Sequence, residues 1–546
     1  MLADPDREVL RFIVHEGTTK AGYPTASSVE RRRPGTQTIM ERLQEAGFIR
    51  LNIDGRTLVP TAAGLRSAAD MTAWAEMETM GLVLGALKDQ YSSQPQLPAS
   101  TKMIAEHLQL PEKTVGRVVL LLAMELGLSW SGAPDGTSAT VGLDERILDA
   151  DPFSKPGPEI AELWAVDRPS VVGIRRLAVD GWAPFKEFSV DLDRLTVLVG
   201  ANATGKSSLG AVLAWLAERM RGPMPPEIAE NRGIRSLFRK GAAARLSLGL
   251  NLDIGQARPL DARFEVLGPE GNPRVVGEFL GVGAEFVVQR SGTSVRFRGT
   301  SGGVQQGGAG ARDFALANLG PAAPGIAVAV RDSFARIRVY GSFDVKDGSL
   351  MRFPQLIEPD ASLNTDGSNL VAVLHRLRNS RDTWDELQGV LRSAVPGFRS
   401  LEVEAAARKG HAAAFWREEG VSERLELADL SDGTLRLLCW VALCLSAKPG
   451  TFIVADEPEQ GLHPRVLAVL ADLFGRAADR GQVLVMTHSP DLLARFPFGS
   501  IRVLTKEDGV PKALKPADSA ALRGMLTEVG GGIAELFRSE ELEALS

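Results

Sequence analysis

The sequence predicts an α/β fold in which a parallel β-sheet carries the functional residues and two small α+β modules precede that sheet. Three observations support the prediction. An apolar strand runs into a glycine-rich loop and a helix near residue 200, two later apolar strands end in acidic residues and in a histidine, and a helix followed by a short hairpin occurs twice before residue 165. Strands that alternate with helices in this order are typical of parallel sheets.

Length and composition indicate a multidomain globular protein. The chain has 546 residues, too many for one hydrophobic core, and its 44% hydrophobic and 24% charged residues are ordinary values. It contains no apolar run of about 18 residues and does not open with a signal-peptide pattern. We therefore expect a cytoplasmic protein with no membrane partner. Cys439 and Cys444 share an apolar segment without metal-ligand spacing, which predicts buried core thiols.

The domain boundaries follow from composition and pattern. The segment 151–158 is rich in proline and glycine, which marks a junction. We expect a first module over residues 1–70, a second module over 71–165 and a large domain over 166–546.

Both modules have an order of elements that resembles the winged-helix family. In the first module, helical periodicity over 36–46 is followed by predicted strands over 48–51 and 57–59. The second module repeats this plan, with helices and strands predicted over 103–108, 112–126, 128–130 and 139–141. Helix, turn, helix and hairpin in that order are typical of this family.

A winged helix binds double-stranded DNA through polar side chains of its second helix and through basic residues that contact phosphate. In residues 1–70 the candidates are Gln37, Thr38, Glu41, Arg42 and Gln44, preceded by Arg31 to Arg33. The first module has ten Lys and Arg against nine Asp and Glu, whereas the second has six against thirteen. Because phosphate binding depends on cationic side chains, the first module is open to either DNA or protein, and the second favours protein contact or a spacer role.

The large domain begins with a phosphate-binding motif. The apolar strand Leu195 to Val199 enters the loop Gly200 to Ser208, which fits G-x-x-x-x-G-K-S, and an apolar helix follows. Glycines let successive backbone N–H groups face phosphate oxygens at the start of a helix. The predicted nucleotide-binding residues are Gly200, Asn202, Gly205, Lys206, Ser207 and Ser208. Lys206 would contact the β- and γ-phosphates of ATP, and the Ser207 hydroxyl would bind Mg²⁺.

A second apolar strand, Thr451 to Ala455, ends in Asp456 and Glu457. In P-loop enzymes the first acid at such a strand end binds Mg²⁺, and the adjacent acid polarises the attacking water. We therefore predict Asp456 as a metal residue and Glu457 as the general base of an ATP hydrolase. Glu459 is the next candidate for the base.

Further motifs occur in a fixed order around this strand. A loop over 430–434 and an apolar helix precede it, and a second helix and a strand ending at Thr487, His488, Ser489 and Pro490 follow it. With the segments 366–370 and 456–464, these motifs resemble the predicted ATPases related to RecF and to the ATPase half of the OLD (overcoming lysogenization defect) nucleases, an ABC-class group of AAA-family, SMC-like ATPases. The resemblance covers roughly 170–540. It implies an ABC-type P-loop ATPase core with an antiparallel β lobe.

The same resemblance implies a role for three loops. Ser431 and Gly433 would form the signature loop, which acts on the γ-phosphate of a nucleotide held by a second copy. An ATP-dependent homodimer, or a higher oligomer, is therefore expected. The segment Gly461 to His463 would cross the dimer interface, and His488 would be the switch histidine that senses the γ-phosphate.

Two positions of the signature loop depart from transporter signatures. Asp432 stands where glycine is usual, and Thr434 replaces a common glutamine, which argues against a transporter subunit. The glutamine that usually joins the two lobes of such ATPases has two candidates, Gln289 and Gln355, and the sequence does not distinguish them.

The region between the P-loop and the signature loop has its own patterns. Alternating segments over 244–339 predict antiparallel strands, and the glycine-rich loop 300–311 predicts a flexible linker. No heptad pattern extends over the length of a coiled-coil arm, and no cluster of spaced acids follows His488. We therefore expect neither an arm nor a nuclease centre.

Together these observations predict an ATPase that binds and hydrolyses ATP with Mg²⁺ and acts as a dimerising switch, with Glu457, His488 and Lys206 as catalytic residues. The resemblance implies a prokaryotic setting in DNA maintenance or anti-phage defence. Two alternatives are open. One is a nucleotide-gated transcription regulator whose front modules bind double-stranded DNA, and the other is a scaffold whose ATP state recruits a separate effector protein.

Overall fold

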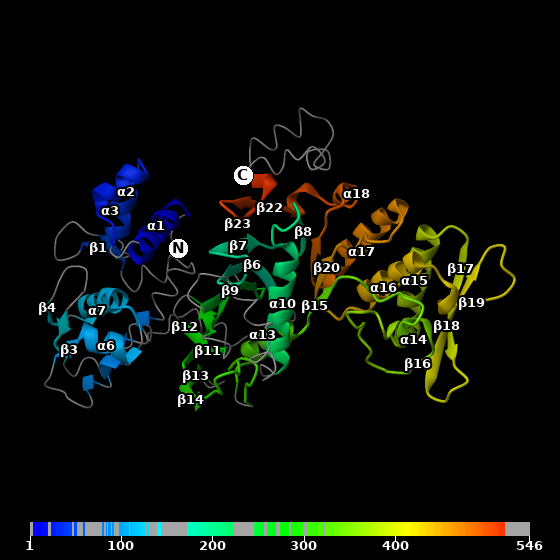
Figure 1. Cartoon of the computed structure of the whole chain (residues 1–546), viewed down its shortest axis with the longest axis horizontal. Coiled ribbons are helices and arrows are strands. Elements are labelled where there is room, and N and C mark those ends of the chain that lie inside the picture. The colour runs from blue at the N-terminus through cyan, green and yellow to red at the C-terminus, as the bar shows by residue number, and fades with distance from the viewer. Residues whose placement is uncertain are drawn as a thin grey trace. The chain divides into compact units, whose positions relative to one another are not determined.

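The structure is a computed structural model (Figure 1). It describes residues 4–19, 23–45, 49–51, 58–60, 79–80, 83–84, 86–88, 90–91, 98–108, 110–126, 128–131, 139–143, 172–222, 245–255, 259–268, 273–282, 285–298, 304–320 and 323–518. The predicted junction over 151–158 lies outside these residues. The chain divides into two compact units, Met1–Ala165 with Phe279–Gly308 and Val166–Glu278 with Ala309–Ser546. Each unit is described by itself.

The first unit opens with three helices and a hairpin. These elements are α1 (Asp4–Thr19), α2 (Ala26–Arg32), α3 (Gln37–Glu45), β1 (Ile49–Leu51) and β2 (Leu58–Pro60). The two strands pair in antiparallel register. The helix and the two strands predicted over 36–59 are thus present, with their connecting turn outside the described residues.

A second set of short elements follows in the same unit. It comprises β3 (Ala99–Ser100), α6 (Thr101–Leu108), α7 (Glu112–Leu126), β4 (Trp130–Ser131) and β5 (Thr140–Val141), with the strand order β3-β5-β4. Buried side chains from both sets, among them Leu10, Leu43, Val118 and Val141, form one hydrophobic cluster. The boundary at residue 70 stays a prediction, because the segment 61–78 lies outside the described residues.

The second unit is built around a six-stranded sheet in the order β15-β20-β21-β8-β22-β23. Its strands are β8 (Leu195–Gly200), β15 (Ile337–Tyr340), β20 (Phe452–Asp456), β21 (Gln482–Met486), β22 (Ile501–Glu507) and β23 (Val510–Leu514). All neighbouring pairs are parallel except β22 and β23. The predicted α/β fold with a parallel sheet is confirmed. Because parallel strands share a direction, the ends of β8, β20 and β21 lie at one edge, where ligands of such sheets bind.

Helices cover both sides of this sheet. Figure 1 shows α10 (Lys206–Arg221) on one side of β15 and β20, and α16 (Asp432–Ser446) and α17 (Leu467–Arg480) on the other. The helix α13 (Gly325–Ala335) packs against α10. Apolar side chains surround α16, and they are buried together with residues of β8 and β20 in one core cluster.

Two expectations from composition can be compared with this core. Cys439 and Cys444 are buried in α16, which confirms their assignment as core thiols. Burial raises the pKa of the Cys444 thiol to about 12 and also raises the pKa of Cys439. Among the described residues, no helix has both the length and the apolar composition needed to cross a membrane.

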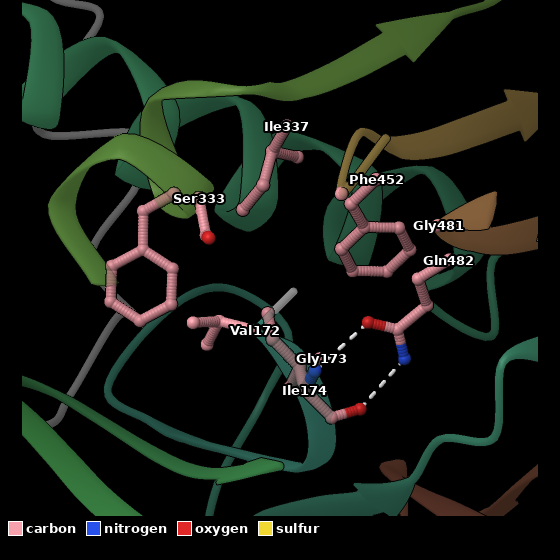
Figure 2. A pocket seen from close by; sticks show the side chains of 10 residues that line it. Val172, Gly173, Ile174, Ser333, Ile337, Phe452, Gly481 and Gln482 are labelled. Atoms are coloured by element: carbon pink, nitrogen blue, oxygen red, sulfur yellow. Dashed lines mark hydrogen bonds between the residues drawn. The ribbon is translucent and has the colours of Figure 1, made fainter. Parts of the chain in front are cut away.

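Antiparallel strands form the second lobe, as predicted, in the order β11-β10-β9-β6-β7 in the second unit, while β12, β13 and β14 belong to the first unit. These strands are β6 (Gly173–Asp180), β7 (Phe188–Asp191), β9 (Arg245–Asp253), β10 (Leu260–Leu267), β11 (Arg274–Val282), β12 (Glu285–Ser291), β13 (Ser294–Arg298) and β14 (Val304–Gly308). The Gln482 amide links the antiparallel lobe to the parallel sheet, because it donates to the carbonyl of Ile174 and accepts from the N–H of Ile174 (Figure 2). A cavity lies beside Gln482, where β21 begins. It is at the opposite end of that strand from Met486.

The linker prediction for 300–311 is wrong over residues 304–308. These residues form β14, which pairs with β13 so that Ser294 faces Gly308 and Arg298 faces Val304. All side chains of β14 are exposed. Its pairing therefore depends on backbone hydrogen bonds to the open edge of β13, and such pairing needs no apolar pattern that a sequence would reveal.

A further insertion lies between β15 and α16, and the sequence did not predict its elements. They are β16 (Gln355–Leu356), α14 (Leu370–Arg378), α15 (Arg381–Ala394), β17 (Phe398–Ala405), β18 (His411–Glu418) and β19 (Leu425–Glu426). The helices α14 and α15 pack against α16 and the small sheet. The insertion therefore supports the helix that begins at the predicted signature loop.

Candidate functional site

The predicted phosphate-binding loop connects β8 to α10, and its glycines are required by its shape. Gly200 and Gly205 have φ of 154° and 108°, a region that side chains rarely occupy. A Cβ at Gly200 would lie 2.3 Å from the carbonyl oxygen of Leu504, and one at Gly205 would lie 3.0 Å from the Phe185 ring. Asn202 is exposed on this loop. The chain thus turns tightly between strand and helix, as the motif predicts.

Lys206 is the first residue of α10, and its side chain is buried in the loop that precedes it. Its Nζ donates to the carbonyls of Gly200 at 2.7 Å and Ala201 at 2.9 Å. The ammonium group is therefore held inside the loop. In the first turn of the helix, Ser207 is exposed and Ser208 is half-buried.

Ser207 meets Asp456, although the two residues are far apart in the sequence. The Ser207 side chain lies close enough to the Asp456 carboxylate to lower its pKa, and Asp456 ends β20, two strands away from β8. Burial raises the pKa of Asp456, and the neighbouring Glu457 raises it further, while Ser207, Lys206 and His488 act in the opposite direction. A divalent cation would stabilise the charged carboxylate at this position.

The oxygen donors at this point fit Mg²⁺. A hydroxyl and a carboxylate are the hard ligands that Mg²⁺ prefers, and this ion commonly takes only one or two protein ligands besides phosphate and water. Among the described residues, no group of three His, Cys, Asp or Glu side chains could hold a metal by itself. The residues present therefore suit an ion that a bound nucleotide helps to hold.

Glu457 and His488 lie side by side at the ends of β20 and β21. The Glu457 Oε1 is 3.7 Å from the His488 Nε2, and the two side chains are 34% and 30% exposed. Glu457 has a φ of 49°, and its N–H donates to the Met486 carbonyl at 2.8 Å. Gln460 donates to the other carboxylate oxygen of Glu457.

The surroundings of His488 favour the neutral form of its imidazole by lowering its pKa. Burial lowers its pKa from the usual 6.5, and the positive charge of Lys206 lowers it further. The negative charges of Glu457 and Asp456 oppose that change without reversing it. A neutral ring can donate one hydrogen bond and accept another.

Glu459 has a contact that the sequence did not predict. Its Oε1 accepts from the Thr487 hydroxyl at 2.6 Å and from the His488 N–H at 3.3 Å. Burial raises the pKa of this carboxyl. These contacts connect the segment after β20 to the loop that carries His488, and they place Glu459 against the backbone of His488. The only available signal was its position two residues after Glu457.

We expect Glu459→Gln to keep turnover within about threefold of wild type, a factor that corresponds to roughly 0.6 kcal/mol. An amide oxygen can still accept from Thr487 and from the His488 backbone. Glu459→Ala should slow hydrolysis more, because both donors lose their acceptor. Steady-state ATPase assays on the two variants test this. A loss in the Gln variant as large as in the Ala variant would show that the charge of Glu459, and not only its acceptor oxygen, acts in the reaction.

The predicted signature loop lies at the start of α16. Ser431 caps this helix by accepting from the Thr434 N–H at 3.2 Å. Gly433 packs against Gly461, where an added Cβ would lie 2.8 Å from the Gly461 carbonyl oxygen. His463 caps the short 3₁₀ turn Pro464–Val466. The signature loop and the loop after the acidic strand therefore contact each other.

The structure thus brings the predicted residues together in two groups. Lys206, Ser207, Asp456, Glu457 and His488 form one group at the strand ends. Ser431 and Gly433 form another, and in the described part of the chain no hydrogen bond or ion pair joins either of them to the P-loop.

The two candidate glutamines are both engaged in local contacts. Gln355 donates to the carbonyls of Leu350 and Ser368 and accepts from the Ala372 N–H. Gln289 lies on β12 in the first unit and accepts from Arg296 at 2.7 Å. The assignment of a lobe-joining glutamine stays open.

Comparison with known proteins finds a similarity over part of the chain. Residues 312–494 match a family model described as an AAA domain, putative AbiEii toxin, type IV TA system. This match agrees with the predicted AAA-family ATPase core over these residues. It includes the signature loop, the acidic strand and His488 but begins after the P-loop.

Several solved structures also share similarity. A crystal structure of the Smc head bound to the C-winged helix domain of ScpA is 14% identical, with 62% of this chain and 97% of that chain covered and a TM-score of 0.42. A Smc head domain with an extended coiled coil, bound to the C-terminal domain of ScpA and derived from Pyrococcus furiosus, is 13% identical, with 66% and 100% covered and a TM-score of 0.42. The SMC head domain from Thermotoga maritima is 13% identical, with 63% and 98% covered and a TM-score of 0.36.

Proposed function

From the AAA domain at residues 312–494, we propose that this chain is a Mg²⁺-dependent ATPase that dimerises in its ATP-bound state. One observation supports this most directly. The P-loop serine meets the acid of β20, and the adjacent acid meets a histidine at the end of β21. P-loop hydrolases need this combination of a phosphate cradle, a metal carboxylate and a base.

Each side chain of the first group has a proposed task. Lys206 and the loop N–H groups bind the β- and γ-phosphates, while Ser207 and Asp456 would hold Mg²⁺, which supplies positive charge to the phosphates. A water molecule attacks the γ-phosphorus, its proton passes to Glu457, and ADP leaves with the bond to the γ-phosphate broken. His488 is neutral and donates a hydrogen bond to the γ-phosphate or to that water.

The second group supports the dimer. Ser431 and Asp432 are exposed at the start of α16, and α16 lies on the opposite side of β15 and β20 from α10 (Figure 1). A helix start favours negative charge, so this loop suits a γ-phosphate. We propose that it binds the nucleotide of a second copy, and that the second copy's loop does the same in return.

The wild-type protein provides the first test. The protein is incubated with ATP and Mg²⁺ in the cold, which slows hydrolysis. We then expect light scattering after gel filtration to give twice the monomer mass of 58.5 kDa. With ADP it should give the monomer mass, because the contact to the γ-phosphate is missing. An equal mass with ATP and ADP, at concentrations that saturate both, would contradict an ATP-dependent dimer.

We propose anti-phage defence or DNA maintenance as the biological setting, with a separate effector protein as partner. The support for the defence setting is the description of the matching family, which names a putative AbiEii toxin of a type IV TA system. A pull-down from native cells with the Glu457→Gln variant tests this, because that variant should accumulate in the ATP-bound form. Recovery of no partner in either nucleotide state would favour a switch that acts alone.

The regulator alternative requires DNA contact by the first module, and the structure weighs against it. Three of the four arginines proposed for phosphate form ion pairs with acids of α1. These pairs are Arg32 with Glu16, Arg33 with Glu8 and Arg42 with Asp6. Paired arginines offer less charge to a phosphate backbone. The polar side chains proposed for base contact are exposed, and with their neighbouring arginines paired we propose that this face contacts a protein.

A further inference from the structure

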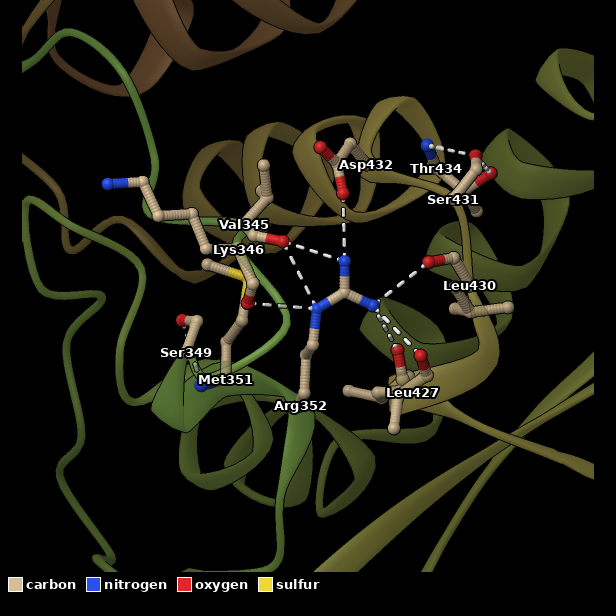
Figure 3. Close-up of polar contacts among 11 residues, drawn as sticks. Val345, Lys346, Ser349, Met351, Arg352, Leu427, Leu430, Ser431, Asp432 and Thr434 are labelled. Atoms are coloured by element: carbon tan, nitrogen blue, oxygen red, sulfur yellow. Dashed lines mark hydrogen bonds and ion pairs between the residues drawn. The ribbon is translucent and has the colours of Figure 1, made fainter.

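Arg352 is a buried cation directly behind the signature loop. It ends the 3₁₀ turn Leu350–Arg352, and its side chain is only 3% exposed. Figure 3 shows its guanidinium group between two segments that are about 80 residues apart in the chain. Neither the nucleotide-binding group nor any sequence motif accounts for this residue.

The guanidinium group bonds both segments at once. On one side, Nε and Nη2 donate to the carbonyls of Val345 and Lys346. On the other side, Nη1 donates to the carbonyls of Leu427, Ala428 and Leu430, at 3.4, 3.0 and 3.0 Å. Nη2 also contacts the Asp432 carboxylate at 2.8 Å.

These acceptors belong to the approach and the start of the signature loop. Leu427–Asp429 forms a 3₁₀ turn, whose last carbonyls have no partner within the turn itself. Ser431 follows directly and caps α16, whose first residue is Asp432. Arg352 therefore bonds the backbone before Ser431 and the Asp432 side chain after it, and none of these bonds involves the Ser431 side chain.

The segment that carries Arg352 is itself held by the Asp366–Asn369 turn. The Asp344 N–H donates to the Asp366 carbonyl, and Gln355 donates to the Ser368 carbonyl. Gly367 has a φ of 78°, and a Cβ there would lie 2.7 Å from Met351 and 3.2 Å from the Cys439 sulfur of α16. This turn, one of the motifs behind the family resemblance, thus supports Arg352 from behind.

We infer that Arg352 is a positioning residue for the signature loop, which it holds in the conformation that binds the γ-phosphate of a second copy. The inference rests on the proposed dimeric ATPase. It assigns Arg352 to the function that the signature loop serves, and not to ATP binding within its own chain. A planar five-donor group is required, because a lysine nitrogen cannot reach both sets of carbonyls.

Arg502 provides a matched control in the same unit. Its side chain is 2% exposed, donates to the carbonyls of Asp191, Gly499 and Ile501, and pairs with the Asp193 carboxylate at 2.7 Å. These partners lie before β8 and at the start of β22, away from the signature loop. Arg352→Lys and Arg502→Lys therefore remove similar buried contacts from different places.

We expect Arg352→Lys to bind ATP with wild-type affinity but to lose ATP-driven dimerisation, with hydrolysis reduced by up to about 100-fold, as when a catalytic group is displaced by ~1 Å. Arg502→Lys should lower the unfolding temperature about as much as Arg352→Lys does, but it should keep hydrolysis within about twofold of wild type. Equal ATPase losses in both variants would show that Arg352 is only structural.

Mixtures of variants make the test specific. Arg352→Lys mixed with Lys206→Ala should regain activity, because one of the two composite sites is then intact. Arg352→Lys mixed with Ser431→Arg should not, because every site then has a damaged signature loop. Activity in the second mixture would overturn the inference. If Lys206→Ala and Ser431→Arg fail to restore each other, the proposed dimer mechanism fails instead.

Folding of Arg352→Lys is checked by its own ATP binding in calorimetry. Should it not bind ATP, Asp432→Ala replaces it in the same mixtures, because this substitution removes the carboxylate end of the contact at an exposed position. We expect weaker dimerisation and the same pattern of restored and unrestored mixtures. Wild-type dimerisation by Asp432→Ala would then count against the positioning role.

Discussion

Glu457→Gln is expected to slow ATP hydrolysis by about 100- to 10,000-fold, the usual range for loss of one general base. An amide keeps the size of the carboxyl group but cannot take a proton from water. Ser207, Asp456 and Lys206 are unchanged, so ATP and Mg²⁺ should bind as in wild type. Single-turnover phosphate release measures the loss, and calorimetry with a slowly hydrolysed analogue measures the affinity.

The variant should also accumulate as an ATP-bound dimer, because the step that ends that state is blocked. Glu459→Gln is the matched control, since it makes the same chemical change two residues away. Wild-type turnover in Glu457→Gln together with a large loss in Glu459→Gln would transfer the role of base to Glu459. Weakened ATP binding in Glu457→Gln would instead indicate that this carboxyl group supports the site structurally.

The grouping of Ser207, Asp456 and His488 could be predicted because local patterns specify each piece. A polar residue that follows an apolar strand marks the carboxyl end of that strand. Parallel pairing brings such ends to one edge of the sheet. The register confirms it, with Asp456 opposite Met486 and Met486 opposite Leu198. Here local periodicity and a general rule of parallel sheets were sufficient.

Other features could not be predicted because they depend on contacts between distant segments. Arg352 bonds carbonyls that follow it by more than 70 residues, and a carbonyl has no sequence signature. Glu459, which follows β20, accepts from Thr487 at the end of the neighbouring strand β21. The strand over 304–308 exists because β13 offers an open edge. In each case the partner is backbone or distant side chain, so no local pattern marks the residue.

Ser431→Arg is expected to leave ATP binding nearly intact and to abolish ATP-dependent dimerisation and hydrolysis. The P-loop group contains Lys206, Ser207 and Asp456, and within the described residues no hydrogen bond joins it to Ser431, so binding within the chain should persist. Across the proposed interface, the long cationic side chain would occupy the space of the partner's γ-phosphate. Ser431→Thr is the matched control, because it keeps the hydroxyl that caps α16 and should keep most activity.

Mixing Ser431→Arg with Lys206→Ala is the decisive form of this experiment. Lys206→Ala alone should bind no ATP, since it removes the loop's lysine. In a mixed dimer, one composite site carries both defects and the other carries none. Neither variant should form an ATP-dependent dimer with itself, so the dimers that form are mixed. Each mixed dimer holds one good site of two, and equal mixing should therefore restore up to about half of wild-type hydrolysis if one intact site can act. Hydrolysis by Ser431→Arg alone, equal to wild type and first order in protein, would place the complete active site within one chain and exclude the dimer mechanism.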